Sequence, residues 1–208
     1  MSTAVHDTPV EQPASFAFTA ENLVKAKAHI AKYPPGRQAS AVLPLLDLAQ
    51  RQHDNWLPRA AMDCVADMLG MAHIRVYEVA TFYSMFNLRP VGKHFFQICT
   101  TTPCWLRGSS EVVEACEKRL GITIGETTPD GQFSLTEVEC LGACVNAPII
   151  QVNDDFYEDL DGPTTERLID ALKRGETPPP GSARQRQTSA PEGGPTTLRD
   201  LSFGGEQR

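Results

Sequence analysis

KHFFQICTTTPC, residues 93–104, and FSLTEVECLGAC, residues 133–144, share one layout. In each, a run with the apolar or alternating character of a β-strand leads directly into two closely spaced cysteines. The two pairs are Cys99-x4-Cys104 and Cys140-x3-Cys144, with 35 residues between them. We therefore expect four thiolates to project from loops at the ends of neighbouring strands and to meet at one metal or iron–sulfur site.

An α/β pattern surrounds these two strands. The helix EVVEACEKRLG (111–121), with Ser109 or Ser110 as its N-cap, separates them, and a hairpin (148–159) and a last helix (162–175) follow. The predicted order β-α-β-β-β-α is a thioredoxin-like plan. If the first two strands are parallel, both cysteine pairs lie beyond their carboxyl ends, where open α/β sheets place their sites.

Upstream of residue 91 the pattern is helical. Helical spacing of apolar residues predicts four short helices, at 19–32, 39–52, 58–69 and 73–82. Thr19 is the expected N-cap of the first, and Gly70 is expected to end the third. These helices predict a small bundle. The predicted organisation is a flexible arm (1–15), a helical bundle domain (16–90), a thioredoxin-like domain (91–175) and a low-complexity tail (176–208).

The tail is rich in Pro, Gly, Ser, Thr and Gln, so it cannot bury enough apolar surface to order alone. Within it, the small apolar island TLRDLSF (197–203) is a candidate segment for docking on a partner, with plain disorder as the alternative.

The composition narrows the class of protein. The chain has 208 residues and a net charge of −7, so we expect no nucleic-acid partner. No apolar run approaches the ~20 residues that span a bilayer, and the N-terminus lacks the features of a secretory signal. We therefore expect a cytosolic compartment, where clustered cysteines are metal ligands more often than disulfides. No Lys or Arg occurs between Arg119 and Arg167, which predicts an acidic surface.

Three kinds of site compete for the four cysteines. Structural zinc sites made of cysteines usually contain a C-x2-C spacing, and a dithiol redox pair needs the same spacing. Neither cysteine pair of this chain has it. The spacing favours a [2Fe–2S] cluster but leaves zinc open. The hydroxyl groups of TTTPC and the backbone beside Gly142 can donate hydrogen bonds to sulfur, which favours the cluster further.

The remaining candidate residues have simpler interpretations. Cys64 and Cys116 are expected to be small buried hydrophobes within helices, and Trp105 is expected to shield the site from water. The five histidines lie outside the cysteine loops and are expected to be ordinary histidines. The chain has no recognisable nicotinamide, flavin or hydrolase motif. If it handles electrons, another polypeptide must supply them.

The cysteine motifs, together with IGETTPDGQFSLTEVECLGACVNAP (124–148) and DDFYEDL (154–160), closely resemble one family. It is the thioredoxin-like [2Fe–2S] subunit of NADH:quinone oxidoreductase (respiratory complex I), called the E subunit in bacteria and flavoprotein 2 in mitochondria. The stretches YPPGRQASAVLPLLDLAQ (33–50) and RVYEVATFYSMFNLRPVGKH (75–94) look like its helical domain. The resemblance covers about residues 16–175.

This resemblance implies that Cys99, Cys104, Cys140 and Cys144 bind one [2Fe–2S] cluster. It also implies a flavoprotein partner that binds NADH and FMN and passes an electron to the cluster, so the chain serves an oxidoreductase without an active site of its own. Further peripheral-arm subunits are implied as partners, and the run from Val76 to Phe86 is a candidate interface, with core packing as the alternative.

The implied location is the cytoplasmic face of the bacterial inner membrane, or alternatively the mitochondrial matrix side, with only indirect contact with the membrane. Relatives also serve NAD-linked formate dehydrogenases and NAD-reducing hydrogenases, and these are alternative assignments. A zinc-stabilised scaffold subunit is the rival from another class.

Overall fold

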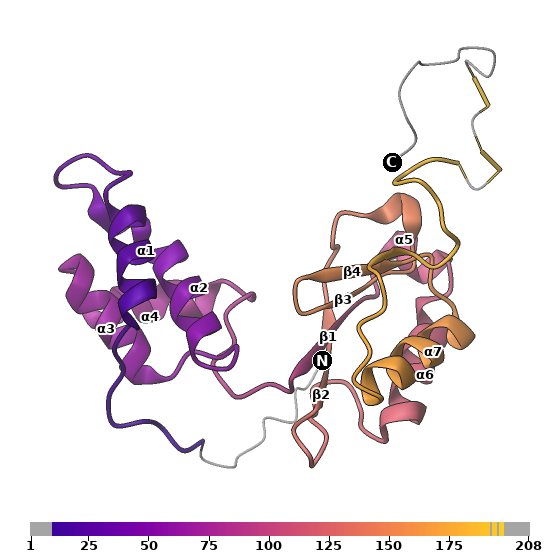
Figure 1. Cartoon of the computed structure of the whole chain (residues 1–208), viewed down its shortest axis with the longest axis horizontal. Coiled ribbons are helices and arrows are strands. Elements are labelled where there is room, and N and C mark those ends of the chain that lie inside the picture. The colour runs from indigo at the N-terminus through magenta and orange to yellow at the C-terminus, as the bar shows by residue number, and fades with distance from the viewer. Residues whose placement is uncertain (1–9, 192, 195, 198–208) are drawn as a thin grey trace. The chain divides into compact units, whose positions relative to one another are not determined.

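The computed structural model describes residues 10–191, 193–194 and 196–197. Two compact units divide the chain between Val91 and Gly92 (Figure 1). Among the described residues, no helix combines the length and the apolar character that crossing a bilayer requires.

The first unit is helical and agrees with the predicted bundle. Its elements are α1 (Ala20–Ile30), the 3-10 helix η1 (Gln38–Ala41), α2 (Val42–Gln52), α3 (Arg59–Leu69) and α4 (His73–Phe82). The Thr19 hydroxyl caps α1 by accepting a hydrogen bond from the Asn22 N–H (3.2 Å), as predicted. Gly70 ends α3 with a φ of +62°. Leu45 and Leu46 of α2 are completely buried in the shared core.

The run from Val76 to Phe86 has two kinds of residue. Val76, Ala80 and Phe86 are buried in the helical core, so core packing is the correct interpretation for them. Phe82 and Met85 are exposed, with 79% of the Phe82 surface accessible. A face of large apolar side chains therefore remains beside the buried set.

His73 links two helices of this unit through two carboxylates. Its Nδ1 lies 3.1 Å from Asp63 Oδ1 and its Nε2 lies 2.8 Å from Asp67 Oδ1. The hydrogen bond to Asp67 is the largest cause that raises the pKa of His73 above its ordinary value. Because α4 begins at His73 and both carboxylates belong to α3, the charged form of the imidazole ties the two helices together.

We expect the helical unit to lose stability as pH rises through the neutral range. A histidine whose pKa is higher in the folded than in the unfolded state stabilises fully below the unfolded value of about 6.5. That contribution disappears as pH rises through the folded value. Urea unfolding at pH ~6 and pH ~8.5, on either side of this range, measures the change through Trp56 fluorescence in a Trp105→Phe background. His73→Gln should flatten the pH dependence, and an unaltered slope would contradict this assignment.

The second unit is a mixed five-stranded sheet in the order β2-β1-β3-β4-β5. Its strands are β1 (His94–Cys99), β2 (Phe133–Val138), β3 (Ile150–Val152), β4 (Asp155–Glu158) and β5 (Gly181–Ser182). Its helices are α5 (Thr102–Leu106), α6 (Ser109–Leu120), the 3-10 helix η2 (Cys144–Asn146) and α7 (Gly162–Lys173). β1 and β2 are parallel, and β3 and β4 form the predicted antiparallel hairpin.

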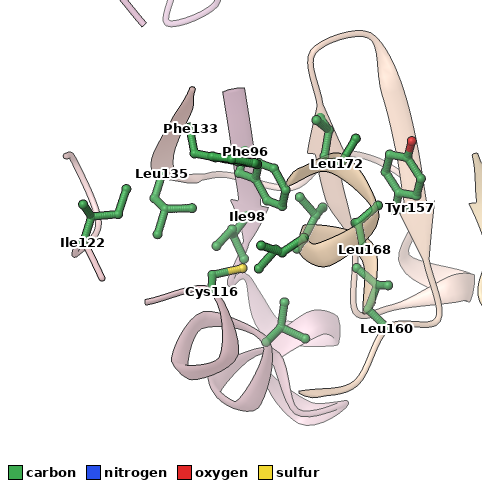
Figure 2. Close-up of a cluster of buried hydrophobic side chains, with 14 residues drawn as sticks. Phe96, Ile98, Cys116, Ile122, Phe133, Leu135, Tyr157, Leu160, Leu168 and Leu172 are labelled. Atoms are coloured by element: carbon green, nitrogen blue, oxygen red, sulfur yellow. The ribbon is translucent and has the colours of Figure 1, made fainter. Parts of the chain in front are cut away.

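The main core of this unit lies between the sheet and the helix pair α6 and α7 (Figure 2). Phe96 and Ile98 of β1 are completely buried in it. Successive strand residues face opposite sides of a sheet, so Cys99 lies on the other face. There it belongs to a separate buried cluster with Ile149 and Cys104. The sheet thus places a cysteine pair on the face that α6 and α7 do not cover.

One local expectation is wrong, and two further elements of the structure were not predicted. Neither Ser109 nor Ser110 caps α6, because Gly108, with a φ of +95°, is the residue before the helix and Ser109 is its buried first residue. Neither α5 nor β5 was expected from the local pattern of residues. The strand β5 lies in the predicted low-complexity tail, and pairing with β4 supplies the order that its composition could not.

The two ends of the chain are described only in part. Residues 198–203 of the island TLRDLSF lie outside the described residues, as do residues 1–9 of the predicted arm. Within the rest of the arm, the Gln12 side chain accepts a hydrogen bond from the Arg59 N–H (2.9 Å).

Candidate metal centre

The parallel pairing of β1 and β2 brings the two cysteine motifs to one end of the sheet. Cys99 is the last residue of β1 and lies opposite Val138, the last residue of β2. Cys140 follows two residues later. The prediction that the motifs lie beyond the carboxyl ends of parallel strands is confirmed for Cys140, whereas Cys99 is still part of its strand.

The first pair, Cys99 and Cys104, is buried. Their exposed fractions are 1% and 0%, and Ile149 packs against them. Cys104 lies in the short helix α5 rather than in a loop, which differs from the expectation. Thr101 precedes this helix, and its hydroxyl lies 3.3 Å from Cys99 Sγ. The Thr101 hydroxyl is thus directed at a sulfur, as the hydroxyl-rich sequence predicted.

In the second pair, Cys140 is exposed in a tight loop, and Cys144 is half-buried at the start of η2. The two Sγ atoms are 3.3 Å apart, and the Gly142 N–H donates to Cys140 Sγ at 3.4 Å. Gly142 has a φ of +82°, and no atom of the described residues lies within 4 Å of a Cβ built on it. The glycine is needed here for its backbone conformation, which aims an N–H at sulfur, rather than for space.

Each pair combines one thiol that ionises easily with one that resists ionisation. Burial acts to raise the pKa of Cys99, but hydrogen bonds from the Thr101 hydroxyl and the Leu141 backbone hold that pKa below its ordinary value. Burial, and then the hydrogen bond with Cys99, raise the pKa of Cys104 to about 12. In the cluster-free chain the first pair therefore keeps a proton at neutral pH.

The second pair behaves in the same way. The Gly142 N–H, followed by the hydrogen bond with Cys144, lowers the pKa of Cys140. The hydrogen bond with Cys140, followed by burial, raises the pKa of Cys144. Charge on Cys99 acts to raise the pKa of both, so the two pairs lie within electrostatic reach of each other. A bound metal favours the thiolate form of every ligand, so metal binding releases the protons that the pairs retain.

The arrangement in two pairs fits a two-metal group. Two thiolates on one tetrahedral metal, each at ~2.3 Å, lie ~3.8 Å apart, close to the Cys140–Cys144 separation of 3.3 Å. A [2Fe–2S] cluster takes two thiolates for each iron. All six cysteines of the described chain are free thiols. In the same described part, no group of three or more His, Cys, Asp or Glu side chains is placed so that it could hold a metal ion.

The other cysteines and Trp105 lie as follows. Cys116 is buried in the core, as expected, and burial raises its pKa to about 12. Cys64 is only partly buried, so the expectation of full burial is wrong for it. Trp105 is 64% exposed, so the prediction that it shields the site is also wrong for the chain by itself. The sulfurs of the first pair are covered instead by Ile149 and its neighbours.

Comparison with known proteins assigns the chain to a family. The family model for the thioredoxin-like [2Fe-2S] ferredoxin matches residues 26–173. The E subunit of the NADH-quinone oxidoreductase of Rickettsia conorii is 58% identical over 159 residues, which cover 76% of this chain and 95% of that protein. The mitochondrial NADH dehydrogenase [ubiquinone] flavoprotein 2 of Dictyostelium discoideum is 51% identical over 189 residues, covering 91% of this chain and 76% of that protein.

Among solved structures, an NAD+-reducing [NiFe]-hydrogenase in the air-oxidized state aligns with a TM-score of 0.55 and 18% identity, covering 62% of this chain and 23% of that chain. At this identity the likeness concerns the fold alone. The family match and the identities to the oxidoreductase subunits reach further. The chain therefore belongs to the thioredoxin-like [2Fe–2S] ferredoxin family and, within it, to the family of E subunits of NADH-quinone oxidoreductase.

Proposed function

We propose that Cys99, Cys104, Cys140 and Cys144 hold one [2Fe–2S] cluster and that the chain is an electron-transfer subunit of NADH:quinone oxidoreductase. The observation that carries this proposal is the arrangement of four free sulfurs as two neighbouring pairs at the ends of parallel strands. When bound, the cluster supplies a site that accepts and returns one electron.

The residues around the sulfurs tune this site in opposite directions. Thr101 and the Gly142 N–H donate to sulfur, which stabilises the more negative, reduced state and raises the reduction potential. The surrounding sequence from Arg119 to Arg167 is acidic, which opposes the addition of an electron. Ile149 keeps water from the first pair and strengthens both effects, because charges interact more strongly in a medium of low dielectric constant.

The electron comes from the FMN of a partner subunit that oxidises NADH, because this chain carries no recognisable motif for either cofactor. Other subunits of the peripheral arm complete the assembly, and we assign the exposed apolar side chains of Phe82, Tyr83 and Met85 to contact with them. The assembly lies on the cytoplasmic face of the inner membrane, or on the matrix side in a mitochondrion. Membership of an NAD-reducing hydrogenase is supported by likeness of fold only.

The assembled complex provides the test. We expect NADH, with NAD+ kept low by regeneration, to reduce one [2Fe–2S] cluster whose EPR signal is absent from an assembled Cys140→Ala complex. The Cys64→Ala complex is the matched control, since Cys64 lies in the helical unit, and it should keep the signal. Persistence of every [2Fe–2S] signal in the Cys140→Ala complex would refute the proposed ligand set. A signal that NADH never reduces would refute the proposed electron route.

A further inference from the structure

After α7 the chain returns to the sheet beside the second cysteine loop. β5 pairs in parallel with β4, and the Tyr157 hydroxyl donates to the Pro178 carbonyl at 3.1 Å. Figure 1 shows this gold segment passing the β4 edge. The family model ends at residue 173, so the returning segment lies outside the matched region.

Arg186 is the centre of this return. Its Nη1 donates to Asp159 Oδ1 at 2.9 Å and to the Val145 carbonyl at 3.1 Å, and its Nε donates to the Ala190 carbonyl at 2.8 Å. The side chains of Arg186 and Asp159 are 10% and 1% exposed. The Ser182 hydroxyl donates to the other Asp159 oxygen at 2.6 Å. A buried ion pair, with further hydrogen bonds to both partners, thus joins the tail to the residue that follows β4. The hydrogen bond from Arg186 to the Val145 carbonyl joins the tail to the cysteine loop.

A second contact acts on the next residue of the loop. Asn146 is only 4% exposed, and its side-chain amide donates to the Thr188 carbonyl at 2.8 Å and to Glu158 Oε2 at 2.5 Å. Its own backbone carbonyl accepts from the Asp159 N–H at 2.7 Å. The two residues that directly follow Cys144 are therefore both tied to the tail, each through a different tail residue.

Apolar packing does not hold this loop against the tail. A cavity of about 730 Å³ lies between the two segments. It is lined on one side by Gly142, Ala143, Val145 and Asn146, and on the other by tail residues between Pro179 and Ser189. The Val145 side chain is 65% exposed. The polar contacts of Arg186 and Asn146 are therefore what fixes the distance between the loop and the tail.

We propose that residues 181–190 form a strap that fixes the backbone from Cys144 to Asn146, and that Arg186 is a positioning residue for the Cys144 sulfur. This inference rests on the proposed function, because the position of the Cys144 sulfur matters if that sulfur is a ligand of the cluster. η2 has the length of a single turn and begins at Cys144 itself. Restraint of the Val145 and Asn146 backbone therefore also restrains the direction of the Cys144 side chain, which governs how firmly a bound cluster is held.

The experiment uses the full chain with its cluster and two variants. Arg186→Gln removes the ion pair, and a chain that ends at Ala183 keeps β5 while removing the rest of the strap. Arg174→Gln is the matched control, because its pair with Glu176 is 59% and 57% exposed and makes no part of the strap. Hydrogen exchange at the Asn146 and Ala147 amides reports on the loop, since these donate to the Ala143 and Cys144 carbonyls.

We expect both strap variants to exchange at these two amides about tenfold faster, with α7 unchanged. Their clusters should be lost to a chelator about tenfold faster, and the EPR line shape of the reduced cluster should change. The control should match the wild type in all three. An effect on thermal unfolding without a change in the EPR line shape would overturn the positioning role.

Unchanged exchange in both variants would overturn the strap itself. If Arg186→Gln does not fold, the truncated chain decides, because in it Asp159 gains access to water. If the chain carries no cluster, the proposed function fails, but the exchange rates still measure the strap in the cluster-free chain.

Discussion

Cys104→Ala is expected to yield a folded chain that carries no cluster. Affinity for the cluster should fall by more than the roughly 10–100-fold that follows removal of a residue that supports a ligand, because here the ligand itself is removed. Cys104 is completely buried beside Cys99, so no other donor can take its place from solvent. Visible absorbance and iron content of the anaerobically purified protein measure the effect.

The matched control for this substitution is Cys116→Ala. Cys116 is equally buried and has a pKa raised to the same value of about 12, but it lies in the core between the sheet and the helices. We expect this variant to keep its cluster and to lose about 1 kcal/mol of stability from the small cavity left behind. Equal cluster content in the two variants would remove Cys104 from the ligand set.

Gly92→Ala is expected to destabilise the second unit by about 3 kcal/mol, or to prevent it from folding. A Cβ at this position would lie 2.6 Å from the Phe133 carbonyl carbon and 2.8 Å from the Ser134 nitrogen. Both are backbone atoms of β2, whose pairing with β1 holds them in place. The Gly92 N–H also donates to the Ser134 hydroxyl at 2.6 Å, which fixes the close approach.

Urea unfolding at constant pH measures this loss as a lower midpoint. Gly193→Ala is the control, because no atom of the described residues lies within 4 Å of a Cβ built there. It should leave the midpoint unchanged. A Gly92→Ala chain with a wild-type midpoint would show that the start of β1 can move away from β2, contrary to their paired register.

Local signals in the sequence predict much of this fold. The helix end at Gly70 and the cap at Thr19 depend on neighbouring residues only, and both occur as predicted. β5 could not be predicted, because its two residues gain order from pairing with β4, which is distant in the sequence. The choice of Gly108 over Ser109 at the start of α6 also depends on tertiary burial of the serine.

The sequence predicts which cysteines form the site but not how their side chains are arranged. The spacing singles out four cysteines, whereas their division into two hydrogen-bonded pairs requires coordinates. The threonine before Pro103 signals a helix start, which could have placed Cys104 in α5. The contact from Arg186 to Val145 joins residues 41 positions apart, so nothing in the local sequence announces it.

The most direct test of the cluster assignment is Mössbauer spectroscopy of the chain. The protein is enriched in the Mössbauer-active isotope of iron and purified without oxygen, and its zinc, iron and sulfide contents are measured on the same sample. We expect about two irons and two sulfides per chain, with both irons in tetrahedral sulfur environments and one becoming ferrous on reduction by one electron. A colourless chain that contains stoichiometric zinc and no sulfide would contradict the assignment.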